Sequence, residues 1–170
     1  MDDTAEDDLA GDLRDRLQER DQTVAVAETV TGGRVGAALT ATPGASAVLD
    51  RVLVPYDYDS LRDLLAVDRE ALDEYGAVSA EVTAQLARVI RDTADVTWGV
   101  ANTGIAGPEG GTDDKPVGTA FVAVAYAAPW GSGDSETIVE RYRFDGDRAT
   151  VQSRLRRQTL EDVLNRVREQ

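Results

Sequence analysis

The sequence contains neither cysteine nor histidine among its 170 residues. Without cysteine the chain forms no disulfide and offers no thiol nucleophile, and without either residue it cannot build a zinc site of the Cys/His kind. Catalytic pairs of the Ser-His and Cys-His type are excluded for the same reason. Any catalysis must therefore use hydroxyl groups, carboxylates, tyrosine, arginine or the single lysine, Lys115.

Long apolar segments are missing as well. No run approaches the roughly 18 apolar residues of a membrane-spanning helix. The acidic N-terminal segment MDDTAEDDLAGDL also lacks the apolar centre of a signal peptide. We therefore expect no membrane partner and a cytoplasmic location.

Basic residues are scarce, with 18 Lys and Arg against 32 Asp and Glu, which gives a net charge of −14 and a pI near 4.3. Such a surface repels phosphate backbones, so we expect no nucleic-acid partner. An acid excess with a single lysine is typical of proteins that stay hydrated in concentrated salt, where screening weakens charge repulsion. We therefore predict a halophilic protein whose stability rises with KCl concentration.

Hydrophobic residues make up 42% of the chain, enough to bury one core, so we predict a single domain over residues 1–170, with about residues 1–6 disordered. Apolar periodicity and turn residues predict strands over 23–27, 47–56, 96–104, 119–127 and 137–144, and helices over 4–20, 32–40, 59–67, 68–76, from 79 and from 147. The last two strands suit an antiparallel hairpin. This order predicts an α/β fold, a three-layer α/β/α sandwich on a mixed sheet.

Two glycine-containing segments follow predicted strands: AETVTGG, from Ala27 to Gly33, and GIAGPEGGTDDKPVG, from Gly104 to Gly118. Loops longer than about 12–15 residues in compact domains are usually functional or disordered. In open α/β sheets, ligands bind outside the carboxyl ends of the strands. We therefore expect both segments to face one pocket.

Several runs together resemble the C-terminal domain of the CinA (competence/damage-inducible) family: AETVTGG, TPGAS, VPY, YGAVS, NTGIAGPEGGTDDKPVGTAFVAVA and FDGDR. The resemblance extends from about Leu17 to the last helix, and TGIAGP followed by KPVG is its most specific part. It implies the CinA C-terminal-domain fold and a homodimer. It also implies hydrolysis of the carboxamide of nicotinamide mononucleotide to the nicotinate nucleotide and ammonia. We expect no cofactor and no metal.

The sequence departs from the family pattern at two positions that matter for chemistry. The family's first motif usually reads AESCTGG with serine as nucleophile, whereas this sequence has Thr29. When Tyr56 is paired with the family's tyrosine, the family's activating lysine falls on Leu61, which cannot accept a proton. The remaining candidates for the base are Asp57, Asp59, Tyr56, Glu28 and Lys115.

The predicted site residues come from the resemblance and from loop chemistry. Thr29 and Tyr56 are the predicted catalytic residues. Substrate binding is predicted for Glu28, Thr31, Gly32, Gly33, Thr103, Gly104, Ala106, Gly107, Lys115 and Arg148. An ammonium beside glycine amides, and amides at a helix N-terminus, both suit phosphate. Each assignment has a plainer alternative: a capped turn, a glycine needed for positive φ, or a surface lysine.

Two functions stay open at this point. The chain is either a nicotinamide-nucleotide amidase or a catalytically inactive nucleotide-binding or regulatory module on the same fold. The intact TGIAGP and KPVG motifs beside an altered nucleophile and base favour weakened or lost activity. Gln152, where the family pattern has arginine, weakens any role transferred to the last helix. Nothing in these residues supports a partner in DNA repair or competence.

Overall fold

The structure is a computed structural model that describes the backbone of residues 3–170 and the side chains of residues 9–170. Residues 1–2 lie outside the described part, and the disorder predicted for residues 1–6 stays a prediction. The strands are β1 (Val24–Glu28), β2 (Leu49–Leu53), β3 (Trp98–Gly104), β4 (Thr119–Tyr126) and β5 (Glu136–Arg143). The helices are α1 (Asp3–Glu19), α2 (Arg34–Ala41), α3 (Tyr58–Leu65), α4 (Arg69–Tyr75), α5 (Ala80–Ala94) and α6 (Arg148–Glu169), with a 3₁₀ turn at Ala45–Ala47.

The strand predicted over 47–56 is shorter at both ends than the sequence indicated. The 3₁₀ turn after Gly44, whose φ is 84°, delays its start. Beyond Leu53, Pro55 has no N–H to donate to a ladder, so the chain leaves the sheet there. This early exit places residues 54–57 over the end of the sheet.

The five strands form one mixed sheet in the order β2-β1-β3-β4-β5. β1 pairs in parallel with β2 and β3, and β4 pairs antiparallel with β3 and β5. The predicted mixed sheet with a late hairpin is thereby confirmed. Its register sets Glu28 beside Asn102 at the carboxyl ends of β1 and β3.

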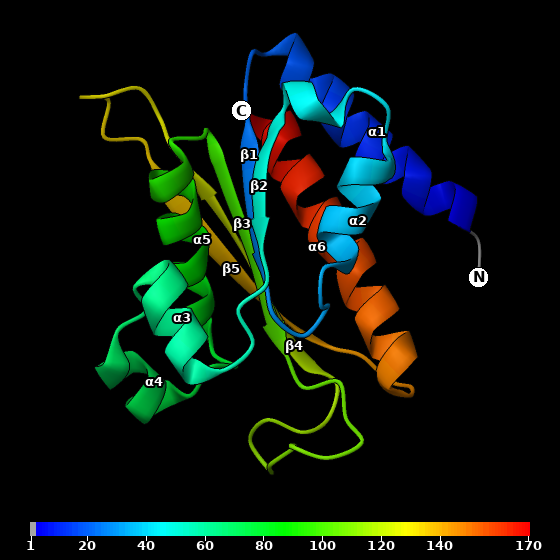
Figure 1. Cartoon of the computed structure of the whole chain (residues 1–170), viewed down its shortest axis with the longest axis vertical. Helices are drawn as coiled ribbons and strands as arrows, with labels where there is room; N and C mark the ends of the chain where they lie inside the picture. Colours follow the sequence, from blue (N-terminus) through cyan, green and yellow to red (C-terminus); the bar gives the residue numbers. More distant parts are fainter. Residues whose placement is uncertain (1–2) are drawn as a thin grey trace.

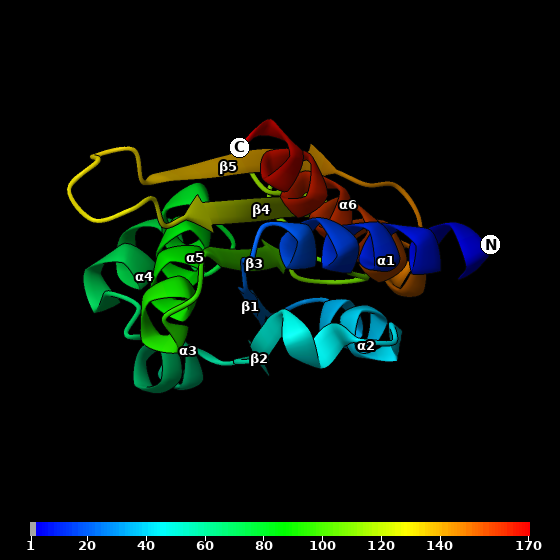
Figure 2. The ribbon, with the colours of Figure 1, turned by 90° about the horizontal axis from the view of Figure 1, so that it is seen from above.

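Helices cover both faces of the sheet, with α1, α2 and α6 on one face and α3, α4 and α5 on the other (Figures 1 and 2). Strand side chains alternate between the two layers. Val24 and Val26 pack under α1, α2 and α6, whereas Ala25 and Ala27 face α3 to α5. In the part of the chain that the structure describes, no helix is both long and apolar enough to cross a bilayer.

Small residues on the second face let α5 lie close to the sheet. A Cβ on Gly99 in β3 would stand 2.0 Å from the carbonyl oxygen of Ala87 in α5. The side-chain hydroxyl of Ser79 accepts from the Val82 N–H at 3.2 Å and so begins α5 as the sequence predicted. This packing holds α5 against β3.

Candidate functional site

A cavity of about 250 Å³ lies at the carboxyl ends of β1 and β3. Both segments that the sequence singled out contribute to it, together with the linker between β2 and α3, α3 itself, the linker before α5 and the start of α6. The residues that line it are Thr29, Val30, Tyr56, Leu61, Ala77, Val78, Gly104, Ile105, Ala106, Gly107, Glu109, Gly110 and Arg148. Six predicted site residues, Thr29, Tyr56, Gly104, Ala106, Gly107 and Arg148, therefore meet around one cavity.

Thr29 is the first residue after β1 and is half-buried. Its backbone N–H and its hydroxyl both point to the carbonyl oxygen of Asn102, at 3.3 Å and 3.2 Å. A carbonyl oxygen accepts a hydrogen bond but does not remove the proton. Thr29 lines the cavity, and in this arrangement the hydrogen-bond partner of its hydroxyl is a carbonyl and not an activating base.

Tyr56 and Arg148 connect opposite walls of the cavity. Arg148, the first residue of α6, donates from Nη2 to the Tyr56 hydroxyl at 3.2 Å and from Nη1 to the carbonyl oxygen of Gly107 at 2.9 Å. Asp147 caps this helix by accepting from the Thr150 N–H, and the hydrogen bonds from Thr150 lower the pKa of Asp147. The ring of Tyr56 stays 69% exposed, so an aromatic face and a guanidinium are both available to a ligand.

Leu61 lies in the cavity wall and is 1% exposed. The position on which the resemblance predicts the family's lysine to fall therefore borders the cavity, and it presents an apolar surface. Asp57 sits just before α3 as its N-cap, accepting from the Ser60 N–H at 2.7 Å, and this bond lowers the pKa of Asp57 below its ordinary value. Neither Asp57 nor Asp59 lines the cavity.

Glu28 is fully buried and its carboxylate is occupied within the protein. Oε1 accepts from the Gly36 N–H at 2.9 Å, and Oε2 accepts from the Val35 N–H at 3.1 Å and from the Thr31 hydroxyl at 2.6 Å. A carboxylate at the N-terminus of a helix stabilises it through its free amides and its dipole. Glu28 thus anchors α2, and it does not line the cavity.

Thr31 and Thr103, both predicted to bind substrate, are also fully buried. The Thr31 hydroxyl lies 3.1 Å from Asn102 Oδ1, and the Thr103 hydroxyl lies 2.8 Å from the hydroxyl of Thr83 in α5. Gly32 and Gly33 have φ of 59° and 93° and turn the chain into α2. The first amides of α2 are already bonded to Glu28, so this turn offers few free N–H groups to a phosphate.

Lys115 lies outside the cavity. Its ammonium donates to the carbonyl oxygen of Tyr75, the last residue of α4. A cation at a helix C-terminus satisfies a free carbonyl and complements the dipole. The lysine therefore ties the long loop to α4, and it borders a separate hollow that also includes Arg141 and Phe121.

Two polar contributors to the site are absent from the residues that the sequence predicted. Glu109, in the GPEGG run, lines the cavity, and a carboxylate set between Pro108 and Gly110 in the long loop was the signal that could have found it. Gln152 donates from Nε2 to the carbonyl oxygen of Val30 at 2.8 Å and so holds the turn after β1. In the described part of the chain no group of three or more carboxylates is placed to hold a metal ion.

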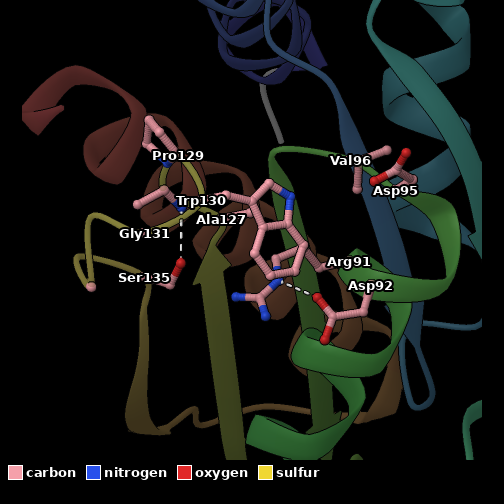
Figure 3. A pocket seen from close by; sticks show the side chains of 11 residues that line it. Arg91, Asp92, Asp95, Val96, Ala127, Pro129, Trp130, Gly131 and Ser135 are labelled. Carbon is pink, nitrogen blue, oxygen red and sulfur yellow. Dashed lines mark hydrogen bonds and ion pairs between the residues drawn. The ribbon is translucent and has the colours of Figure 1, made fainter.

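A larger cavity, about 760 Å³, lies at the opposite end of the sheet, between the end of α5 and the turn joining β4 to β5 (Figure 3). The indole of Trp130 there is fully exposed, and Arg91 donates from Nε to Asp92 at 2.7 Å. The hydroxyl of Ser135 accepts from the Ala128 N–H. None of the predicted site residues lines this cavity, so the smaller one is the candidate site.

Known proteins are similar to this chain in sequence and in fold. Residues 6–167 match the CinA C-terminal domain family. A CinA-like protein from Anaeromyxobacter sp. (strain K) is 45% identical over 153 residues, which is 90% of this chain and 35% of that protein. One from Thermosynechococcus vestitus is 44% identical over 84% of this chain and 33% of that protein. The chain spans about a third of the length of these curated relatives.

Solved structures agree with the fold. The competence/damage-inducible protein CihA from Agrobacterium tumefaciens superposes with a TM-score of 0.87 at 34% identity, covering 94% of this chain and 95% of that one. A CinA superfamily protein from Klebsiella pneumoniae superposes with a TM-score of 0.87 at 29% identity, covering 97% and 99%. The resemblance noted in the sequence is thereby confirmed, and the chain belongs to the CinA C-terminal domain family.

Proposed function

We propose that the cavity binds a pyridine nucleotide of the nicotinamide mononucleotide type and hydrolyses its carboxamide to a carboxylate and ammonia. One observation supports this most directly. Thr29, Tyr56, the loop from Gly104 to Gly107 and Arg148 come from distant parts of the chain, yet they line one cavity of about 250 Å³. A hydroxyl, an aromatic ring, glycine-rich backbone and a guanidinium are the groups that an aromatic amide carrying a phosphate requires.

Each group has a role in this reaction. The pyridine ring lies against Tyr56 and the apolar wall at Leu61, and the phosphate pairs with the Arg148 guanidinium. The Thr29 hydroxyl attacks the amide carbon. Backbone N–H groups of the Gly104–Gly107 loop stabilise the oxyanion that forms. Glu28 and Thr31 belong to the AETVTGG segment but are buried. Their role is to support the turn that presents Thr29.

A second function is favoured by a different observation. Leu61 occupies the wall where the family's lysine would stand, and the Thr29 hydroxyl bonds to a carbonyl. Both features suit a module that binds the nucleotide and does not turn it over. Cytoplasmic location, a homodimeric assembly, adaptation to high salt and a place in NAD salvage belong to the same proposal.

Ammonia release from nicotinamide mononucleotide in molar KCl separates the two functions. The amidase reading predicts that Thr29→Ala abolishes turnover. It also predicts that Thr29→Ser raises turnover on the order of tenfold, about 1.4 kcal/mol of barrier, because serine lacks the methyl group that restricts χ1 and crowds the attack. Equal rates in all three proteins would remove Thr29 from the mechanism. Calorimetric binding without ammonia release would identify the binding module.

A further inference from the structure

We propose that Glu109 is the general base of this site, in place of the lysine that the chain lacks. The inference rests on the proposed amidase function and adds the group that activates Thr29. It concerns a residue on the long loop between β3 and β4, not one of the groups near the aligned lysine position.

The positions of the other candidates exclude them as the general base. Glu28 is fully buried with both oxygens bonded to α2 and Thr31. Asp57 and Asp59 lie outside the cavity, and Asp57 is committed to the cap of α3. Lys115 is bonded to the end of α4, beyond the cavity. None of the four can take a proton from Thr29 without leaving its present place.

Two groups in the cavity remain, Tyr56 and Glu109. A phenol ordinarily keeps its proton at neutral pH, and the Tyr56 hydroxyl already accepts from the Arg148 guanidinium. Glu109 is the one carboxylate among the described residues that line the cavity, and a carboxylate is an ionised acceptor at neutral pH. The base is therefore assigned to Glu109.

The geometry permits the transfer. Glu109 and Thr29 line the same cavity of about 250 Å³. A base has to act on the hydroxyl directly or through one water, and we propose that the carboxylate does so when it turns inward. Glu109 is exposed and follows Pro108 in the loop, and its side chain has the rotamer freedom to turn inward when a ligand enters. Arg148 lines the same cavity and supplies a positive charge there.

The proposed steps balance in atoms and charge. Glu109 takes the Thr29 proton as the oxygen bonds to the amide carbon, and then gives that proton to the departing nitrogen, which leaves as ammonia. A water attacks the resulting ester, loses a proton to Glu109, and releases the pyridine carboxylic acid. The proton returns to the Thr29 oxygen, so the net reaction is amide plus water to acid plus ammonia.

The test compares ammonia release and calorimetric affinity for nicotinamide mononucleotide in molar KCl. Glu109→Gln should lower the turnover rate at least about 100-fold and change the affinity less than about threefold, because general-base catalysis is worth roughly 10²–10⁴. Glu109→Asp should retain part of the rate. Asp113→Asn, which removes one charge from the same loop outside the cavity, is the matched control and should match the wild type.

A double variant that adds Leu61→Lys to Glu109→Gln should regain turnover, since it returns a proton acceptor to the family's position. Glu109→Gln within threefold of the wild-type rate would overturn the assignment. Ammonia release by Leu61→Lys from an otherwise silent wild type would keep the proposed substrate and refute Glu109 as base. A silent wild type that also fails to bind the nucleotide would refute the proposed function, and this inference with it.

Discussion

Replacing Glu28 by glutamine tests whether this residue holds the protein together or contacts ligand. The carboxylate is fully buried and accepts three hydrogen bonds, from the N–H groups of Val35 and Gly36 and from the Thr31 hydroxyl. Glutamine keeps the shape but turns one oxygen into a donor. Either orientation of its amide sets that donor against an N–H or hydroxyl donor that the carboxylate now accepts.

The cost follows from these contacts. A hydrogen bond to a charged group contributes about 1.5–3 kcal/mol, and a buried donor without a partner costs about 1–3 kcal/mol. One lost bond and one opposed donor therefore give a loss of about 2.5–6 kcal/mol. For a chain of this size, 1 kcal/mol corresponds to about 2–4 °C in Tm, so we expect a fall of roughly 5–24 °C.

Urea and thermal unfolding in the same KCl buffer measure the loss, and Glu81→Gln is the control. Glu81 is exposed in the first turn of α5, where losing its charge should cost less than about 1 kcal/mol. Nucleotide affinity of the folded Glu28→Gln protein should stay within a few-fold of the wild type. A variant with unchanged stability and lost affinity would refute the anchoring role and restore Glu28 as a ligand contact.

Two further predictions concern packing and pH. Gly99→Ala should lower the free energy of unfolding in urea by about 3 kcal/mol, because its Cβ would stand 2.0 Å from the Ala87 carbonyl oxygen. Gly11 has open space around it in α1, so Gly11→Ala should raise the free energy of unfolding by about 0.5–1 kcal/mol. Equal effects would refute the close approach of α5. Burial raises the pKa of Asp162, which accepts from Tyr142, above the ordinary unfolded value of about 3.9. The folded state then binds the proton more tightly than the unfolded state. The free energy of unfolding of the wild type should therefore fall relative to that of Asp162→Asn as pH rises from about 4. A difference between the two proteins that stays constant between pH 4 and pH 7 would contradict this.

Much of the fold could be predicted because its signals are local. The nearly continuous apolar run TVAVA indicates a strand buried on both faces, and Val24 and Ala25 do face different layers. The sequence predicts that helices begin at Ser79 and Asp147. Each of these side chains accepts a hydrogen bond from the backbone N–H of the residue three positions later. Such signals depend on neighbours within a turn of chain, so one sequence is enough to read them.

The candidate site was predicted in part, since the motifs identified the loops but not the direction of each side chain. Arg148 bonds to Gly107, 41 residues away, and to Tyr56, 92 residues away. Lys115 has the charge for a phosphate, yet its partner is the carbonyl of Tyr75, 40 residues earlier. Which residue faces a cavity depends on how elements that are far apart in the sequence pack together. A local sequence pattern does not indicate such contacts.

The sequence by itself determined the α/β class, the mixed sheet and the family, because periodicity, caps and the TGIAGP and KPVG motifs lie within short stretches of chain. It also excluded thiol and histidine chemistry by composition alone. The tertiary structure decided that Glu28 serves α2 and that Glu109 and Leu61 share the cavity with Thr29. The reason is physical: burial and hydrogen bonding between distant segments assign each polar group either to the scaffold or to the ligand.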